Sequence, residues 1–353
     1  MLARLLYPRL RGLFLKDARR SWNEDVAASS ARLEASLNDL RAEIATLRRG
    51  YRDLLVAELD RRDAPVVEAA RSKLDRHVIG AHVSKAVADA EVRTRPMPHL
   101  VIERLLPPEV YELLLRAMPP VEVFQDRDPV KQDFEMGALD TAPALSRLVW
   151  RFFDDDLVGG VLASALLRRL APAVAAHYAE TGGPEFGERA AAIPHRSFAG
   201  RIQLRRPGYS LQPHLDPKRV VITGLIYFAR PGDDPSYGTQ LFSVDRGFVS
   251  AGIKTYFPEQ HGLSCTVAST VPYMPNTMLA FVNSGAAHGA TLPREAPLKE
   301  RYAYQFYIKP DDGALKRLLA GLPEDARAPW AELFTPKADR PPAHGSTTPL
   351  PWP

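Results

Sequence analysis

Cysteine is nearly absent from this chain: Cys265 is the only one among 353 residues. A single cysteine cannot close a disulfide within the chain, so the fold does not depend on an oxidising compartment, and we expect a cytoplasmic protein. Cys265 stands at the start of a strand-like run with no partner motif beside it. We therefore interpret it as a buried structural thiol and not as a nucleophile.

Long apolar runs and a strong excess of one charge are also missing. No stretch approaches the ~20 apolar residues that a membrane-spanning helix needs. The net charge is only +4, and the second half of the chain has no basic stripe with aromatic platforms, so no nucleic-acid partner is indicated. Residues 1–20 are basic, with leucines at helical spacing. We expect them to pack on protein, and peripheral membrane attachment remains the alternative.

The N-terminal region, residues 1–95, is predicted to be helical. Within residues 27–62, large apolar residues recur at alternating spacings of four and three, which is the heptad pattern of a coiled coil. Such a seam favours a homo-oligomer, with a long helix packed on its own domain as the alternative. Pro65 is expected to end this helix, and residues 66–90 to form a second one. The seam consists of Leu33, Leu37, Leu40, Ile44, Leu47, Tyr51 and Leu54.

Residues 96–335 have a different sequence pattern from the N-terminal region, and we interpret them as one domain. Helices are predicted at 109–117, 144–180 and 313–334, and the segment 121–136 is a candidate lid. From residue 200 onward, short β-rich runs alternate with turn residues, which is typical of an antiparallel sandwich or barrel in an α+β protein. The tail, residues 336–353, is rich in proline. The predicted strands are 201–206, 219–229, 239–244, 265–273, 277–283 and 301–308.

Three residues have the chemistry of a metal site. His214 and Asp216 are two positions apart, so in an extended chain both side chains point to the same side. His288 follows an apolar strand-like run and a glycine turn, and it can supply a third ligand from a facing strand. Two histidines and one carboxylate on one face of a metal form the facial triad of non-haem iron(II) oxygenases, which leaves positions open for a cosubstrate and O2.

Arginines near this pattern are candidates for binding a carboxylate. Arg301 opens the strand that follows His288, where a guanidinium can bind a carboxylate with two parallel hydrogen bonds. Lys299 and Arg294 are rival candidates in the preceding loop. Arg205 is a second candidate for a carboxylate of the cosubstrate or of an acidic substrate, and a salt-bridged strand residue is the alternative.

In combination these motifs resemble the 2-oxoglutarate/Fe(II)-dependent oxygenase superfamily, on its prolyl-hydroxylase-like side. Residues 207–216 are similar to the first ligand motif of that family, and residues 276–281, His288-Gly289 and Arg301-Tyr302 are similar to its distal motif. The sequence departs from the family at Arg205, where a tyrosine often stands, and at Tyr237-Gly238, where a pair of glycines is usual. The resemblance implies a double-stranded β-helix, or jelly-roll, over residues 200–309, with flanking helices.

The same resemblance implies the activity. Iron(II) would be held by His214, Asp216 and His288, and 2-oxoglutarate would bind the iron and pair with Arg301. With O2, and with ascorbate as a further candidate cofactor, such a hydroxylase releases succinate and CO2 while it oxidises an unactivated C–H bond. The substrate, whether a small molecule, a glycan or a protein side chain, stays open. The alternative is a non-catalytic jelly-roll protein that binds a metal or a sugar and oligomerises through the N-terminal helix.

Overall fold

The computed structural model describes residues 3–125, 128–245 and 254–334. The chain divides into two units, Met1–Arg61 and Arg62–Pro353. The tail that the sequence assigns to residues 336–353 lies outside the described residues.

The N-terminal helix is longer than the sequence predicts. Helix α1 runs from Ala3 to Arg71 and passes through Pro65, which we expected to end it. Proline removes one backbone N–H from a helix and crowds the preceding turn. Val67 and Ala70, which follow Pro65, are buried. Their packing offsets the lost hydrogen bond, and the helix ends only six residues beyond the proline.

In the described residues of the unit Arg62–Pro353, ten strands form two antiparallel sheets. The larger sheet has the order β1-β8-β5-β10-β3-β2, and the smaller has the order β4-β9-β6-β7. The strands are β1 (His99–Ile102), β2 (Lys131–Glu135), β3 (His195–Arg205), β4 (Ser210–His214), β5 (Ile222–Tyr227), β6 (Thr239–Val244), β7 (Cys265–Val271), β8 (Thr277–Val282), β9 (Ala286–Thr291) and β10 (Arg301–Pro310).

This strand order is that of a jelly-roll. Strands β3 to β10 supply four members to each sheet, in the orders β8-β5-β10-β3 and β4-β9-β6-β7. Two four-stranded antiparallel sheets with such crossovers are the double Greek key of jelly-rolls. The predictions of an α+β fold and a jelly-roll core are therefore confirmed. β9 was not predicted, because Ala286–Thr291 contains small residues and a glycine and lacks the usual β-branched pattern.

The candidate lid, residues 121–136, has a different structure from the one expected. Lys131–Glu135 form strand β2, which pairs with β3 at the edge of the larger sheet. Gln132 and Phe134 are buried there. Residues 126–127 lie outside the described part of the chain. The strand therefore extends the sheet, and Asp133, which pairs with Gln203, is held close to β3.

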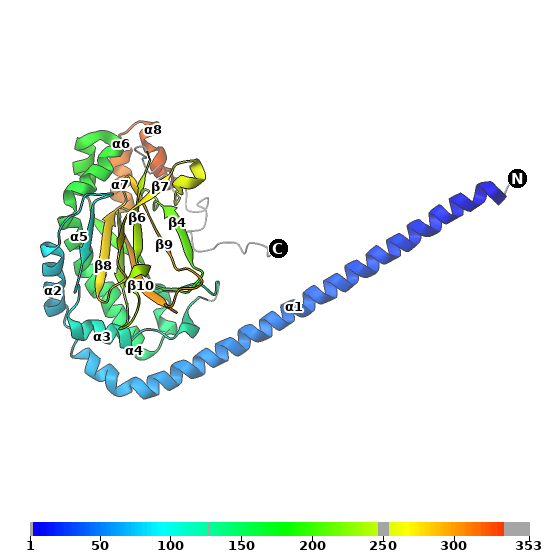
Figure 1. Cartoon of the computed structure of the whole chain (residues 1–353), viewed down its shortest axis with the longest axis horizontal. Helices are drawn as coiled ribbons and strands as arrows, with labels where there is room; N and C mark the ends of the chain where they lie inside the picture. The colour runs from blue at the N-terminus through cyan, green and yellow to red at the C-terminus, as the bar shows by residue number, and fades with distance from the viewer. Residues whose placement is uncertain (1–2, 126–127, 246–253, 335–353) are drawn as a thin grey trace. The chain divides into compact units, whose positions relative to one another are not determined.

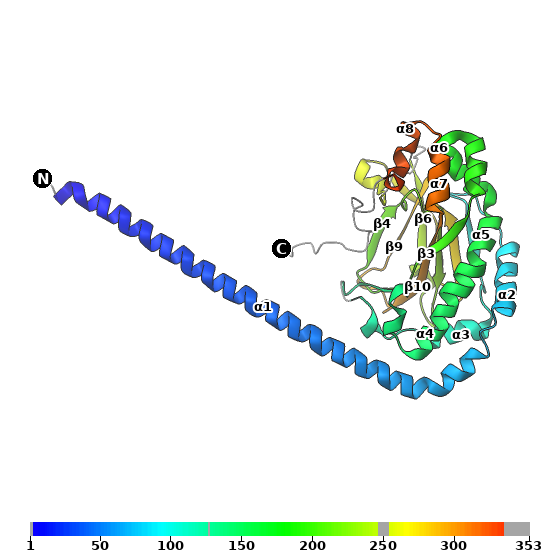
Figure 2. The same cartoon turned by 180° about the vertical axis from the view of Figure 1, so that it is seen from behind.

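Helices cover the outer face of the larger sheet (Figures 1 and 2). Even-numbered residues of β10 point to this side, and Tyr304 stacks against Trp150 and meets Phe153 edge-on. Phe153 lies in η3, an 11-residue π-helical segment where the sequence predicts an interruption at its two glycines. The helices are α2 (Arg76–Asp89), α3 (Pro108–Arg116), α4 (Ala144–Arg151), η3 (Phe152–Leu162), α5 (Ala163–Arg169), α6 (Ala171–Ala191), α7 (Asp312–Leu319) and α8 (Glu324–Arg327).

The opposite face of the larger sheet forms the interior between the two sheets. Leu225, Leu279 and Ala303 from the larger sheet share one buried cluster with Leu241 and Ala286 from the smaller. Since alternate residues of a strand face the same side, the odd-numbered residues of β5, β8 and β10, and those of β3 from Arg201 onward, line this interior. Any polar residue at such a position therefore faces the space between the sheets.

Within the described residues, no single helix is long and apolar enough to cross a membrane. Two helical segments, Ala144–Arg169 and Ala171–Ala191, have the length and apolar composition of a membrane span only when they are taken together, and they are bent by 76° relative to each other.

The buried histidine of α6 generates a prediction about acid stability. His177 is 1% exposed, and its Nε2 lies 3.1 Å from the carbonyl oxygen of Lys218. Burial, followed by the charge of Lys218, lowers the pKa of His177 to about 3. In the unfolded chain His177 binds a proton with its ordinary pKa near 6.5. The contribution of neutral His177 to the free energy of unfolding is therefore fully present above pH 6.5 and is lost as the pH falls toward 3.

We predict that the metal-free protein loses about 2 kcal/mol through His177 between pH 6.5 and pH 4.5, and that His177→Gln lacks this loss. Glutamine keeps an N–H donor for the Lys218 carbonyl. Urea unfolding of both proteins at the two pH values measures the difference. An equal pH dependence in wild type and variant would show that His177 is not the group responsible. Burial also lowers the pKa values of His99 and His195, but both residues are present in wild type and variant, so their contributions cancel in the comparison.

Candidate metal centre

The structure brings together the three residues that the sequence selects as metal ligands. His214 ends β4 and is paired in register with His288 of β9, while Asp216 follows two residues after His214. One ligand atom from each side chain lies within 4.8 Å of the others. Nε2 of His214 is 4.0 Å from Asp216 Oδ1, and Nε2 of His288 is 3.8 Å from Asp216 Oδ2.

All three side chains are buried, with exposed fractions of 3 to 5%. Burial, followed by the charge of His214, lowers the pKa of His288 to about 3, against a smaller raising effect of Asp216. His288 is therefore neutral at physiological pH, which is the form of imidazole that binds a metal. Ligand atoms at these separations fit one ion bound at about 2 Å after small side-chain adjustments.

Neighbouring side chains hold Asp216 in place. The Thr223 hydroxyl donates to Asp216 Oδ2 at 2.6 Å, and the Tyr307 hydroxyl donates to Oδ1 at 3.5 Å. Asn283 Nδ2 donates to the backbone oxygens of Asp216 and Pro217 at 2.7 and 3.1 Å. Hydrogen bonds of this kind orient a metal ligand and tune its basicity. Side chains of the larger sheet and of the loop after β8 thus position the carboxylate of Asp216, which follows β4 of the smaller sheet.

His214 and His288 are also fixed by their surroundings. The Nδ1 atom of His214 lies 3.0 Å from the Gln212 carbonyl oxygen, which favours an Nδ1–H and leaves Nε2 with its lone pair toward Asp216. The ring of His288 contacts Phe281 at a centroid distance of 4.6 Å. Phe281 belongs to the buried interior cluster, so the triad lies at the edge of that interior.

Arg301 lies in the same interior, at the first residue of β10. Its Nε donates to the Tyr237 carbonyl oxygen at 2.7 Å, and Nη2 donates to Thr239 Oγ1 at 3.3 Å. The guanidinium carbon lies 5.3 Å from the ring centres of both Tyr227 and Tyr273. The side chain is 5% exposed, and no acidic side chain of the described residues forms an ion pair with it. A buried cation without a carboxylate is costly, so this site favours an anion.

Arg205 already has protein partners. It is 2% exposed, and its Nη2 lies 2.8 Å from Asp133 Oδ1. Nη1 donates to the carbonyl oxygens of Gln132 and Leu204, and the guanidinium lies over the Tyr209 ring at 5.0 Å. These contacts fit the alternative of a salt-bridged strand residue. A role of Arg205 in binding the cosubstrate stays a prediction.

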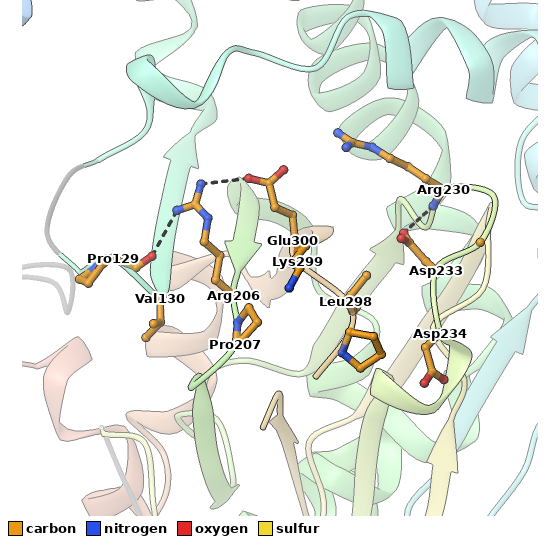
Figure 3. A pocket seen from close by; sticks show the side chains of 12 residues that line it. Pro129, Val130, Arg206, Pro207, Arg230, Asp233, Asp234, Leu298, Lys299 and Glu300 are labelled. Carbon is orange, nitrogen blue, oxygen red and sulfur yellow. Dashed lines mark hydrogen bonds and ion pairs between the residues drawn. The ribbon is translucent and has the colours of Figure 1, made fainter. Parts of the chain in front are cut away.

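The rival residue Lys299 lies elsewhere. It is exposed and lines a cavity of about 670 Å³ that contains none of the metal ligands (Figure 3). Across this cavity Arg206 pairs with Glu300 at 3.0 Å, and the backbone N–H of Arg230 donates to Asp233 at 2.7 Å. The residues come from the loops before β2 and β10 and after β3 and β5. Arg301 is therefore the candidate that faces the interior with the triad.

The sequence did not point to several residues that shape the site. Thr223, Tyr307 and Asn283 support Asp216, while Tyr227 and Thr239 surround Arg301. A signal was present in β10, where the polar residues Arg301, Gln305, Tyr307 and Lys309 all stand at odd-numbered positions, while the even-numbered positions from Tyr302 to Ile308 are aromatic or aliphatic. Polar residues on one face of a buried strand indicate a polar interior.

Comparisons with known proteins give matches among solved structures only. No protein-family model and no curated protein matches the chain. A prolyl-4-hydroxylase from Pseudomonas putida is 14% identical, with 65% of this chain and 99% of that chain covered, at a TM-score of 0.34. The epimerase SnoN, solved with Fe3+, alpha ketoglutarate and nogalamycin RO, is 16% identical over 65% of this chain and 84% of its own, with a TM-score of 0.33. HygX from Streptomyces hygroscopicus, solved with nickel, 2-oxoglutarate and hygromycin B, is 16% identical over 60% and 82%, with a TM-score of 0.36.

The triad generates a direct prediction. His214→Ala and His288→Ala should each weaken Fe(II) or Mn(II) binding at least about 100-fold, because two remaining ligands cannot hold the ion in this interior. Anaerobic calorimetry measures the affinity. His82→Ala, which removes an exposed histidine of α2, is the matched control and should bind metal like wild type. Full metal affinity in either ligand variant would show that the site lies elsewhere.

Proposed function

We propose that this protein is an iron(II)- and 2-oxoglutarate-dependent oxygenase that hydroxylates an unactivated C–H bond. One juxtaposition supports the proposal: a buried triad of two histidines and a carboxylate shares an interior with Arg301, a buried guanidinium without an acidic partner among the described residues. Iron(II) held by such a triad keeps positions open for a cosubstrate and O2, and it supplies the oxidising chemistry when bound.

The residues of the chain have separate roles in this reaction. His214, Asp216 and His288 hold the ion, and Thr223 and Tyr307 keep the carboxylate of Asp216 oriented. Burial, followed by the nearby Asp216 charge, raises the pKa of Tyr307, so its hydroxyl stays protonated and can donate. Arg301 binds the distal carboxylate of 2-oxoglutarate, and the aromatic rings of Tyr227 and Tyr273 exclude water from that contact.

The test of this function is succinate formation. Purified protein with Fe(II), 2-oxoglutarate and ascorbate is incubated with panels of amino acids, glycans, peptides and small molecules, and succinate is measured with and without each compound. The non-catalytic jelly-roll alternative predicts metal binding without any succinate. An oxygenase that epimerises or cyclises its substrate also forms succinate, so mass spectrometry of the product must show the added oxygen of a hydroxylation.

Arg301 gives the second test. A charged hydrogen-bond pair in a partly desolvated site contributes roughly 1.5 to 3 kcal/mol. Arg301→Ala should therefore raise the dissociation constant of 2-oxoglutarate about 10- to 150-fold, at ~1.4 kcal/mol per decade. Calorimetry on the Mn(II)-loaded protein measures this without turnover. Lys299→Ala is the control, and a large effect there with none in Arg301→Ala would move the carboxylate site to the loop.

We further propose that α1 makes the protein a homo-oligomer. The seven seam residues of the heptad pattern are 42 to 74% exposed, with Ile44 the least and Leu54 the most exposed. Isolated helices are marginally stable in water, and most helical stability comes from packing of an apolar face. Leucines fill the fourth heptad positions of the seam, and Ile44 fills the central first position between Leu37 and Tyr51; isoleucine at the first position with leucine at the fourth favours two strands. Glu43 and Arg48, five residues apart beside the seam, would pair between parallel helices.

Ile44→Asp should dissociate this oligomer. Each seam residue gains roughly 1.5 to 3 kcal/mol by burial, and in a dimer two carboxylates would face each other at the centre of the seam. Light scattering at tens of micromolar measures the molar mass. Ala45→Asp adds the same charge off the seam and should leave the mass unchanged. A wild-type protein that is monomeric under these conditions contradicts the proposal. Metal binding and succinate formation should be the same in both variants.

A further inference from the structure

The wall of the interior beside Asp216 is polar and cationic. Arg201 and Gln203 of β3 and Gln305 and Tyr307 of β10 all face the space between the sheets. Gln305 Oε1 accepts hydrogen bonds from Arg201 Nε at 2.9 Å and from Gln203 Nε2 at 2.7 Å. Arg201 Nη2 also donates to Gln305 Oε1 and, at 3.3 Å, to the Tyr307 hydroxyl, which in turn reaches Asp216. Arg201 is therefore connected to a metal ligand through one side chain.

An irregularity in β3 produces this arrangement. The register with β10 shifts between Gln305 and Tyr307, opposite Ala199 and Gly200. Ala199 has a φ of 56°, and a Cβ on Gly200 would collide with the Asp154–Tyr304 hydrogen bond on the outer face. The extra residue of a bulge changes which side chains face a given side. As a result both Arg201 and the even-numbered Phe198 accompany Tyr307.

Arg201 has no acidic partner within ion-pair distance among the described residues. On the neighbouring strand β2, Asp133 pairs with Arg205, and Glu135, which is in register with Arg201, is exposed and forms no ion pair with it. The oxygen that accepts hydrogen bonds from Arg201 belongs to the neutral carboxamide of Gln305, which offsets only part of the charge of a half-buried guanidinium. Arg201 thus keeps a full positive charge beside the metal site.

Further cations lie beyond Tyr307. The Lys309 ammonium is 4.8 Å from the centre of the Phe198 ring, and Phe198 packs on Tyr307. Asp312 is shared between Lys309 at 3.4 Å and Arg219 at 3.0 Å. Burial lowers the pKa of Lys309, and the positive charges of Arg219 and Arg196 lower it further against the effect of Asp312. The potential along this wall is therefore positive.

The charges decide which substrate fits. If the proposed function holds, a divalent metal and Arg301 balance the charges of Asp216 and dianionic 2-oxoglutarate, and Arg205 balances Asp133. Arg201 remains without an acid within ion-pair distance among the described residues. A monoanionic carboxylate matches the single charge of its guanidinium, whereas a phosphate monoester would bring two negative charges. A guanidinium matches a carboxylate in shape and can bind it with two parallel hydrogen bonds.

We propose that Arg201 anchors the substrate through a carboxylate group, so that the enzyme acts on a carboxylic acid. The amide groups of Gln203 and Gln305 line the same wall. They donate hydrogen bonds to polar atoms next to that carboxylate or accept hydrogen bonds from them. This inference rests on the proposed function, because the metal and the cosubstrate define the charge that remains on Arg201.

Calorimetry with simple acids tests the inference without turnover. The protein, loaded with Mn(II) and saturated with 2-oxoglutarate, is titrated with acetate, butyrate, benzoate and phenylacetate, with the four matching amides, and with phenyl phosphate. At least one carboxylate should bind at least 10-fold more tightly than its amide. Arg201→Gln should weaken that carboxylate about 10- to 100-fold and leave the affinity for 2-oxoglutarate unchanged. Arg201→Lys, which keeps the charge, should retain the preference for acid over amide.

Arg206→Gln is the matched control. Arg206 is five residues further along the chain, just beyond the end of β3, where it lines the cavity that contains none of the metal ligands and pairs with Glu300 (Figure 3). The Arg206→Gln variant should bind the carboxylates with the same affinity as wild type. The inference is overturned if acids and amides bind equally, if no carboxylate binds, or if phenyl phosphate binds more tightly than the carboxylates. It is also overturned if Arg201→Gln binds the carboxylate as tightly as wild type does. Failure of wild type to bind 2-oxoglutarate would instead contradict the proposed function.

Discussion

The buried carboxylate of Asp216 is the group on which the arrangement of the site depends. A carboxylate with 3% exposure is costly unless it is paired or hydrogen-bonded. Its partners come from both sheets: Thr223 and Tyr307 from the larger one, and His214 and His288 from the smaller one. The interactions that make this burial tolerable therefore also fix the distance between the sheets at the metal centre. A metal ion adds a stronger interaction at the same point.

Polar and apolar contacts divide the interior into regions with different chemistry. Phe281 and the aliphatic cluster lie behind His288, whereas the other wall carries hydrogen-bonding side chains of β2, β3 and β10. In a low-dielectric interior each charged group keeps a strong field, so the placement of cations favours some anions over others. The same strands thus supply both the framework and the charged groups of this interior.

The sequence was sufficient for the parts of the fold and the site that depend on local pattern. The short β-rich runs of β5, β8 and β10 and the two-residue spacing of His214 and Asp216 are local features of the sequence, so they could be predicted. The path of α1 through Pro65 and the assignment of Lys131–Glu135 to the sheet depend on contacts with distant residues. For the same reason Thr223, which is seven residues from Asp216 on another strand, could not be identified as its hydrogen-bond donor.

Three arginines of one interior show why residue type alone did not assign their roles. Arg205 is neutralised by Asp133, while Arg301 has aromatic rings and one hydroxyl around it and Arg201 has a carboxamide. Burial is similar for Arg205 and Arg301, at 2 and 5%, so exposure does not distinguish the salt-bridged arginine from the one proposed to bind a ligand. The distinguishing quantity is the charge that the protein leaves without an acidic partner. A guanidinium of this interior that lacks such a partner is stabilised by an anion from outside, and this is the common argument for the cosubstrate proposed at Arg301 and the substrate proposed at Arg201.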